Sequence, residues 1–99
     1  MELYKRIWIK YMSGFTTADK LTVEVRVFAT LRSYLPELSI GEPKVTQVEK
    51  GTTIGELRES LGLPEEMVKV IMVNHLQAFP EDLIANGDRI TYIPAVAGG

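Results

Sequence analysis

Alternating apolar and polar residues along the chain predict its strands. Between residues 21 and 27 every second residue is aliphatic, a period-two pattern that is typical of a strand with one buried face. The same alternation appears more weakly over residues 44–49 and again over residues 89–93, where Pro94 ends it. Residues 68–73 are rich in β-branched side chains and predict a buried strand.

Residues 53–56 carry the signature of a helix N-terminus. The Thr53 hydroxyl is placed to accept the amide hydrogen of Glu56, while the Glu56 carboxylate reaches back to the Thr53 amide, which forms a capping box. Gly62 supplies a left-handed C-terminal cap, and Pro64 prevents the helix from continuing. The apolar side chains between these signals share one face, and they are Ile54, Leu57 and Leu61. We therefore expect one amphipathic helix between the second and third strands.

The remaining segments of the domain are expected to be loops and turns. Residues 28–35 form a short apolar segment that Pro36 stops, and residues 39–43 are loop-like because they contain Gly and Pro. The Asn-His pair at residues 74–75 is turn material, and the Asn86-Gly87 pair predicts a type I′ turn. The order strand, strand, helix, strand, strand predicts an α+β domain in which a small mixed sheet wraps over the helix.

Residues 1–20 differ from the rest of the chain and are expected to form an N-terminal extension. Their apolar side chains fall on one stripe at helical spacing, and they are Leu3, Tyr4, Ile7, Trp8, Tyr11, Met12 and Phe15. Lys5, Arg6 and Lys10 lie opposite this stripe. Such a helix could pack on the domain or on a partner, or it could touch a membrane surface. The segment could also be disordered, or the protein could begin at Met12; packing or disorder is favoured over membrane contact.

Composition narrows the class of protein. The chain has 99 residues, of which 45% are hydrophobic and 24% charged, and this suits one compact domain. We place that domain at residues 21–99, with a flexible tail over residues 94–99. The net charge of -2 argues against nucleic acid as a partner, because such binders need a basic face. The longest aliphatic run is far shorter than a membrane-spanning helix requires, and together with the absence of cysteine it indicates a cytoplasmic protein.

The sequence offers little for a metal site or for acid-base catalysis. His75 is the only histidine, and no cysteine is present to complete a metal site. The adjacent carboxylates of residues 65–66 and 81–82 each follow a proline, so they are interpreted as solvated charges at turns or helix starts. Residues 51–55 lack the length and the lysine of a phosphate-binding loop. We therefore expect no metal, no bound cofactor and no catalytic pair.

The most distinctive feature of the chain is the diglycine at residues 98–99. Glycine lacks a Cβ atom, so it lets another protein's backbone and a nucleotide approach closely. Nothing beside Gly99 shields its carboxyl carbon, which suits adenylation followed by acyl transfer. The alternative is an ordinary frayed terminus. We favour the functional interpretation, because two adjacent glycines at this position are uncommon by chance.

Short runs of residues toward both ends of the domain resemble one protein family. They are Val27-Phe28-Ala29-Thr30-Leu31-Arg32, Val73-Asn74, Asn86-Gly87-Asp88-Arg89 and Ile93-Pro94-Ala95-Val96-Ala97-Gly98-Gly99. In this order they resemble the small subunit of molybdopterin synthase, within the wider family of ubiquitin-like sulfur carriers. The resemblance covers residues 21–99 and implies the β-grasp fold. The segment 28–36 favours the molybdopterin branch over the thiamine carriers, although residues 92–95 replace the family's aromatic run and Pro-Pro pair.

The resemblance implies a carrier that has no active site of its own. An E1-like adenylyltransferase would use ATP to adenylate Gly99, and a sulfur donor such as a cysteine desulfurase would convert the acyl adenylate to a thiocarboxylate. The large subunit of molybdopterin synthase would then take up the tail, which comprises Pro94, Ala95, Val96, Ala97 and Gly98. Phe28 and Ile93 match apolar docking positions of the family. Alternation along the strand favours a core position for Ile93, whereas surface and core are both open for Phe28.

Three functions remain for a domain of this kind. A sulfur carrier serves the molybdopterin pathway or, alternatively, the thiamine pathway. A ubiquitin-like modifier forms isopeptide bonds with lysines through Gly99. An interaction domain with an inert tail needs neither Gly99 nor an activating enzyme. All three share the fold, so the fold alone does not separate them.

Overall fold

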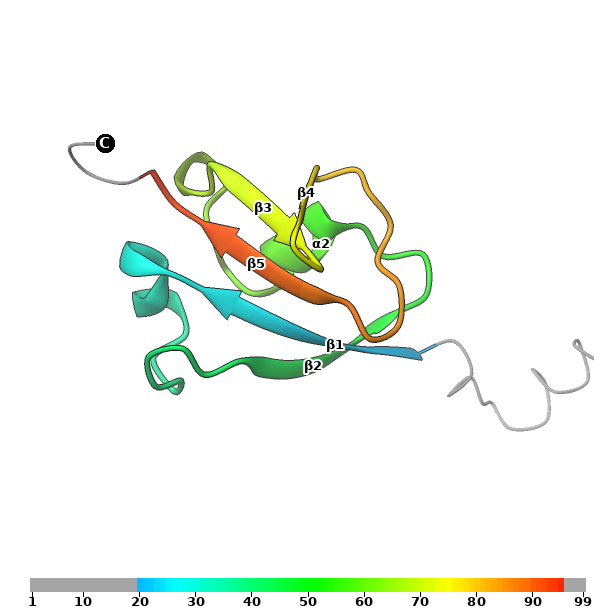
Figure 1. Ribbon diagram of the computed structural model, residues 1–99, viewed down its shortest axis with the longest axis horizontal. Coiled ribbons are helices and arrows are strands. Elements are labelled where there is room, and N and C mark those ends of the chain that lie inside the picture. The colour runs from blue at the N-terminus through cyan, green and yellow to red at the C-terminus, as the bar shows by residue number, and fades with distance from the viewer. Residues whose placement is uncertain (1–19, 96–99) are drawn as a thin grey trace, which may run out of the picture.

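The computed structural model describes residues 20–95, which form a five-stranded mixed sheet with one α-helix on one face (Figure 1). With η denoting a short 3₁₀ helix, the elements in chain order are β1 (Lys20–Val27), η2 (Ala29–Tyr34), β2 (Lys44–Glu49), α2 (Ile54–Ser60), η3 (Glu65–Met67), β3 (Val70–Val73), β4 (Leu76–Ala78) and β5 (Arg89–Ile93). The predicted α+β arrangement of a sheet over one main helix is confirmed. The predicted helix of the N-terminal extension lies outside the described residues.

The first and last strands of the domain lie side by side within the sheet. The strand order is β2-β1-β5-β3-β4, in which β1 and β5 run parallel and every other pair is antiparallel. Val27 at the end of β1 is in register with Tyr92 of β5, and Tyr92 is in register with Ile71 of β3. The C-terminal ends of β1 and β5 therefore point toward the same end of the sheet, where the tail begins.

The side chains that face the helix form one continuous core. Alternation determines which ones they are, because every second residue of a strand lies on the same face. The buried apolar residues are Val23, Val25, Val27, Leu31, Leu35, Ile54, Leu57, Leu63, Ile71, Ala78, Ile84, Ile90 and Tyr92. Tyr92 is fully buried, and its hydroxyl donates a 2.8 Å hydrogen bond to the Ile54 carbonyl oxygen. This bond links β5 to the first turn of α2.

The buried Tyr92 hydroxyl is expected to make stability depend on alkaline pH. Burial raises the pKa of Tyr92 above its ordinary value of 10.0, and the charge of Arg58 lowers it to a smaller extent. The unfolded chain therefore loses this proton first as the pH rises, so the free energy of unfolding should fall above pH ~10, by up to about 1.4 kcal/mol per pH unit. Urea unfolding between about pH 9 and pH 11 measures the slope. Tyr92→Phe should flatten it, whereas Tyr34→Phe, at an exposed site, should not. Equal slopes in the two variants would contradict the argument.

Both ends of α2 are fixed by the residues that the sequence pattern indicates. The Thr53 hydroxyl oxygen accepts from the Glu56 amide at 3.1 Å, and the Glu56 carboxylate accepts from the Thr53 amide at 2.9 Å, so the capping box is confirmed. Gly62 has a φ of 79°, and the amides of Gly62 and Leu63 donate to carbonyl oxygens in the last turn. This arrangement is a Schellman motif, and it ends the helix as expected.

The structure corrects the predicted turns and adds a strand. Strand β4 was not predicted, because a three-residue strand is too short to show a period. The two-residue turn Asn74-His75 joins β3 to β4, and both residues have positive φ, as a type I′ turn requires. The type I′ prediction for Asn86-Gly87 is wrong, because only Gly87 of that pair has positive φ. The Asn86 side-chain oxygen instead accepts a 2.8 Å hydrogen bond from the Thr22 amide, which ties this loop to β1.

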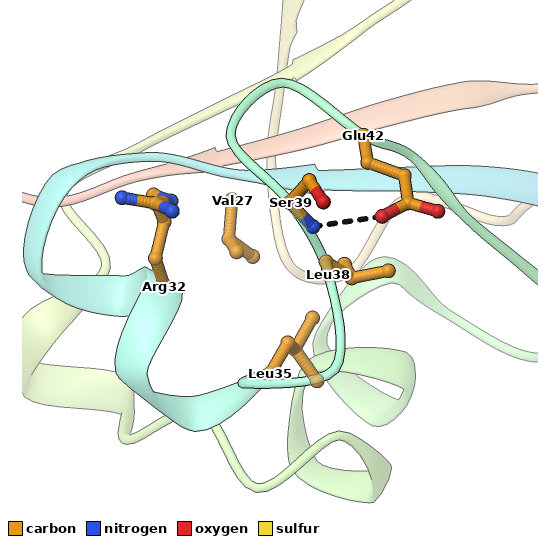
Figure 2. Close-up of a pocket in the computed structure, with 6 residues that line it drawn as sticks. All are labelled: Val27, Arg32, Leu35, Leu38, Ser39 and Glu42. Carbon is orange, nitrogen blue, oxygen red and sulfur yellow. Dashed lines mark hydrogen bonds between the residues drawn. The ribbon is translucent and has the colours of Figure 1, made fainter.

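The apolar segment after β1 forms η2 and closes one end of the core, where Leu31 and Leu35 are buried. Ala29, directly after Phe28, has a φ of 52°, a left-handed conformation that costs a non-glycine residue about 1 kcal/mol. A cavity of about 10 Å³ lies next to η2. Figure 2 shows the residues that line it, which are Val27, Arg32, Leu35, Leu38, Ser39 and Glu42. Such a volume holds at most one water molecule. It is therefore too small to be a ligand site.

Candidate functional site

The tail leaves the sheet at the end of β5. The Ile93 carbonyl oxygen accepts a 2.8 Å hydrogen bond from the Lys69 amide, which holds the last residue of β5 against the chain that enters β3. Pro94 is buried and Ala95 is exposed. Residues 96–99 lie outside the described residues, so their threading and the chemistry of the terminal carboxylate stay predictions. Figure 1 shows that β1 passes into η2 at this same end of the sheet.

Phe28 and Ile93 lie next to each other beside this exit. Val27 and Tyr92 are in register in the parallel pair, and the next residue on each side is Phe28 and Ile93. Phe28 is 44% exposed, Ile93 is half-buried, and neither belongs to the buried core. The core position expected for Ile93 is therefore wrong, because alternation along β5 turns Tyr92 toward the helix and Ile93 toward the opposite face. Of the two positions left open for Phe28, the surface is the one observed.

The sheet face opposite the helix carries a shallow hollow that includes these two residues. Its volume is about 320 Å³, and it is lined by Arg26, Phe28, Met72, His75, Arg89, Thr91 and Ile93. We call this surface the open-face hollow. Arg26, Thr91 and Met72 form one row across three neighbouring strands. Because the hollow is wide and built from three strands, it suits a protein surface better than an enclosed small molecule.

Positive charge surrounds the apolar part of the open-face hollow. Arg26 of β1 and Arg89 of β5 both line it. A carboxylate oxygen of Glu24 lies 3.7 Å from the guanidinium of Arg26, and this one carboxylate balances only one of the two cations. A partner with an apolar centre and an acidic rim would therefore complement this face.

Hydrogen bonds from Asn74 and Asp88 hold the end of the hollow where His75 lies. The Asn74 amide group donates to an Asp88 carboxylate oxygen at 2.9 Å, and its side-chain oxygen accepts from the Arg89 backbone amide at 2.9 Å. The second Asp88 carboxylate oxygen accepts from the Ala85 amide at 2.8 Å. Asp88 is buried, and these bonds satisfy its carboxylate. The network holds the β3–β4 turn against the start of β5, and so sets the positions of His75 and Arg89.

Phe28 and Ile93 were predicted from the sequence as docking residues, but the other residues of the hollow were not. The signal was present in the alternation, because Arg26 lies between two buried valines and Arg89 precedes buried Ile90. Alternation cannot show which strands are neighbours, and the hollow exists only because β1, β5 and β3 are adjacent. His75 occupies a turn and is exposed, in keeping with the turn predicted there.

The other candidates for chemistry have structural explanations. The carboxylates at residues 65–66 are exposed at the start of η3, and the Asp82 carboxylate accepts a 2.9 Å hydrogen bond from the Phe79 amide in a turn. Among residues 20–95, the His, Asp and Glu side chains form no group that could hold a metal ion. In the same part of the chain, no helix is both long enough and apolar enough to cross a membrane.

Comparison with solved structures defines the class of protein. The Haloferax volcanii HVO 2177 protein matches with a TM-score of 0.64 and 22% identity, over 82% of this chain and 89% of that chain. SAMP1 from the same organism matches with a TM-score of 0.60 and 19% identity, over 79% and 99% of the two chains. A chain in the complex of subunits 1 and 2 of the Helicobacter pylori molybdopterin-converting factor matches with a TM-score of 0.51 and 24% identity, over 80% and 100%. At these identities the likeness shows the fold alone, and that fold is the ubiquitin-like β-grasp.

A family assignment follows from the sequence. The model of the Mut7-C ubiquitin family matches residues 20–98, which is most of the chain. The chain therefore belongs to the Mut7-C ubiquitin family. No curated protein matches the sequence significantly. Fold and family thus agree that the chain contains a small ubiquitin-like domain. Assignment to the molybdopterin branch of such proteins is more specific than these comparisons and belongs to the proposal below.

Proposed function

We propose that this protein is a sulfur carrier whose Gly99 carboxylate is activated by a partner enzyme and converted to a thiocarboxylate. One observation supports the proposal above the others: the tail begins at the end of a central strand, beside an exposed phenylalanine and an open sheet face. The backbone is hydrogen-bonded up to Ile93, and Ala95 is exposed. A rigid domain that presents a short tail next to a docking face suits entry of the tail into another protein's active site.

In the proposed reaction the carrier supplies only its terminal carboxylate. An E1-like adenylyltransferase joins a carboxylate oxygen of Gly99 to the α-phosphorus of ATP, and pyrophosphate leaves. The outer sulfur of a donor persulfide, formed by an enzyme such as a cysteine desulfurase, then attacks the carboxyl carbon; a C–S bond forms, the C–O bond to AMP breaks, and AMP leaves. A second thiol of the donor system attacks the inner sulfur of the resulting acyl disulfide, which breaks the S–S bond, releases the thiocarboxylate and leaves the two donor thiols joined as a disulfide. The carrier needs no catalytic side chain and no bound cofactor for any of these steps.

For the acceptor we propose a pterin precursor held by the large subunit of a molybdopterin synthase. The Helicobacter pylori complex of subunits 1 and 2 of molybdopterin-converting factor contains a chain of similar fold, which supports a partner of this kind. The resemblance assigns entry into the large subunit to a tail that starts at Pro94. Because Pro94 is buried, we propose instead that the segment free to enter is Ala95, Val96, Ala97, Gly98 and Gly99.

The intact mass of the protein from its native cell tests the proposal directly. Replacement of one oxygen by sulfur is the expected change, but oxidation of one of the four methionines adds a very similar mass. The chain contains no cysteine, so alkylation with iodoacetamide separates the two: a thiocarboxylate gains one adduct, and a sulfoxide gains none. The adduct should map to the C-terminal peptide. A population without any alkylatable species, under conditions that preserve thiocarboxylates, would refute the carrier proposal.

The open-face hollow is the proposed docking surface, with Phe28 as its central contact. Phe28→Asp should lower the thiocarboxylated fraction recovered from the native cell at least tenfold, because losing a central aromatic contact costs about 2 kcal/mol or more. The fold should be unaffected, since Phe28 lies outside the core. Leu83→Asp, at an exposed aliphatic residue on the helix side of the sheet, is the matched control. Equal thiocarboxylation in the two variants would remove Phe28 from the docking surface.

A ubiquitin-like modifier is the second candidate function. The fold match to SAMP1, the small archaeal modifier protein 1, supports it. In a modifier the same acyl adenylate is consumed by a lysine amine, so the product is an isopeptide bond at Gly99 rather than a C–S bond. The mass experiment separates the two functions, because conjugates carry the whole mass of this chain on another protein. An unmodified and unconjugated chain would favour an interaction domain with an inert tail.

A further inference from the structure

A second apolar surface lies on the helix side of the sheet, beside the short edge strand β4. Leu76 and Leu83 are 73% and 68% exposed there. They line a groove of about 460 Å³, which we call the β4 groove, together with Ile54, Val73, Ala78 and Asp82. Single exposed leucines are ordinary on a protein surface, but two that share one groove indicate a surface that another apolar element covers.

The strand register places the β4 groove on the opposite side of the sheet from the open-face hollow. Leu76 is paired with Val73, and two residues along the same strands Ala78 is paired with Ile71 in the core. Leu76 therefore points to the helix side of the sheet. Only the first residue of α2, Ile54, reaches the groove, so the helix leaves Leu76 uncovered. The two apolar surfaces are thus separate and could be occupied at the same time.

The chain that precedes β1 enters the domain close to this groove. Lys20 is in register with Glu49 at the end of β2. The Glu49 carbonyl oxygen accepts from the Thr52 amide at 3.1 Å, and the Thr52 carbonyl oxygen accepts from the Ile84 amide at 3.1 Å. Ile84 directly follows a leucine of the groove. Figure 1 likewise shows the start of β1 at the same end of the sheet as the loop after β4. Residues 1–19 are therefore attached within reach of the groove.

Residues 1–19 have the composition that such a groove requires. Seven apolar residues recur in this segment at helical spacing, and they are Leu3, Tyr4, Ile7, Trp8, Tyr11, Met12 and Phe15. A helix that carries this stripe would be about 20 Å long. Apolar anchors at such spacing are the means by which an amphipathic helix binds a hydrophobic groove.

We propose that residues 1–19 dock as an amphipathic helix in the β4 groove of the same molecule. Charge favours this surface over the open-face hollow. Residues 1–19 carry three basic residues against two acidic ones, so the segment as a whole is positively charged. The carboxylates of Asp82 and of the adjacent Glu81 attract such a segment toward the β4 groove, whereas Arg26 and Arg89 repel it from the open-face hollow. In this position the segment covers Leu76 and Leu83 and leaves the tail and its docking face free.

Tryptophan fluorescence tests the proposal, because Trp8 is the only tryptophan of the chain. In the full-length protein its emission should lie at shorter wavelength, and its quenching by acrylamide should be several-fold weaker, than in the urea-unfolded chain. Leu83→Lys places a cation in the groove and should return both quantities to the unfolded values while the far-ultraviolet circular dichroism of the domain is retained. Val45→Lys, at an exposed aliphatic residue of β2, is the matched control and should change neither.

Each other outcome would overturn the proposal. A solvent-exposed Trp8 in the unaltered protein would show that the segment does not dock, and protection that survives Leu83→Lys would show that it docks elsewhere. Loss of protection in Phe28→Lys but not in Leu83→Lys would assign the segment to the open-face hollow. Protection that increases with protein concentration would assign the groove to a second copy of the chain. Protection that requires anionic lipid vesicles would assign the segment to a membrane surface.

Discussion

Removal of Gly98 and Gly99 is expected to abolish thiocarboxylate formation and to leave the free energy of unfolding unchanged. Thiocarboxylate formation should respond and stability should not, because the chemistry is proposed at Gly99, whereas Tyr92 is the last residue of the core. The new terminus would carry the side chain of Ala97, which would crowd a site shaped for glycine. Iodoacetamide alkylation followed by intact mass measures the thiocarboxylated fraction, and urea unfolding measures stability.

Ala97→Ser is the matched control for this truncation, because it alters the tail but keeps its length and both glycines. This variant should be thiocarboxylated to at least half the level of the unaltered chain. Sulfur loading that persists in the truncated protein would show that Gly99 is not the reacting residue. A fall in the free energy of unfolding of the truncated protein would show instead that the tail contributes to the fold.

Ile90→Ala is expected to lower the free energy of unfolding by about 3 kcal/mol, because deleting a buried aliphatic side chain removes its transfer energy and leaves a cavity. Ile90 is 1% exposed and belongs to β5, which pairs with β1 on one side and β3 on the other. Paired strands on both sides hold the backbone at this site, so it has little freedom to collapse. Urea unfolding at neutral pH provides the measurement.

Ile40→Ala makes the same chemical change at a position that is 81% exposed, in the loop before β2. It should alter stability by no more than about 0.5 kcal/mol. A loss at Ile90 that is as small as the loss at Ile40 would mean that the middle of the sheet is not the centre of the core. The comparison removes the same atoms at both sites, so the difference reports the burial of the side chain.

The local elements of this domain could be predicted from the sequence where short-range chemistry determines them. Thr53 and Glu56 can only satisfy each other's backbone amides in a helix start, and Gly62 and Pro64 end that helix for equally local reasons. Alternation identified β1 and β5 because each has one buried face, as Val25 in β1 illustrates.

Features that depend on neighbours distant in sequence could not be predicted in the same way. β4 is three residues long and is a strand only because β3 pairs with it through the Asn74-His75 turn. Asn86-Gly87 has the composition of a hairpin turn, but the strands beside it are not partners, and Asn86 bonds to β1 instead.

The candidate site also combines features that depend on local sequence with features that depend on distant strands. The roles of Gly99 and the tail could be proposed from the sequence because they depend on the chain itself, and they stay predictions because residues 96–99 lie outside the described residues. Ile93 was predicted in the core because its strand alternates. Alternation does not show which of two successive residues faces the core, and in the structure that residue is Tyr92. The open-face hollow with Arg26 and Arg89 required the adjacency of β1 and β5, which lie at opposite ends of the domain sequence.

The position of β5 between β1 and β3 also determines when the domain can fold during its synthesis. A growing chain that has reached only β4 has no strand to join β1 to β3, so its sheet remains in two parts and its core stays open. Non-local pairing of this kind is completed late. Chains interrupted before Ile93 are therefore expected to stay unfolded, and proteases remove such chains continuously. Because of this strand order, the domain folds only after β5 has been synthesised. An activating partner that binds the folded domain therefore meets only chains whose synthesis has reached the tail.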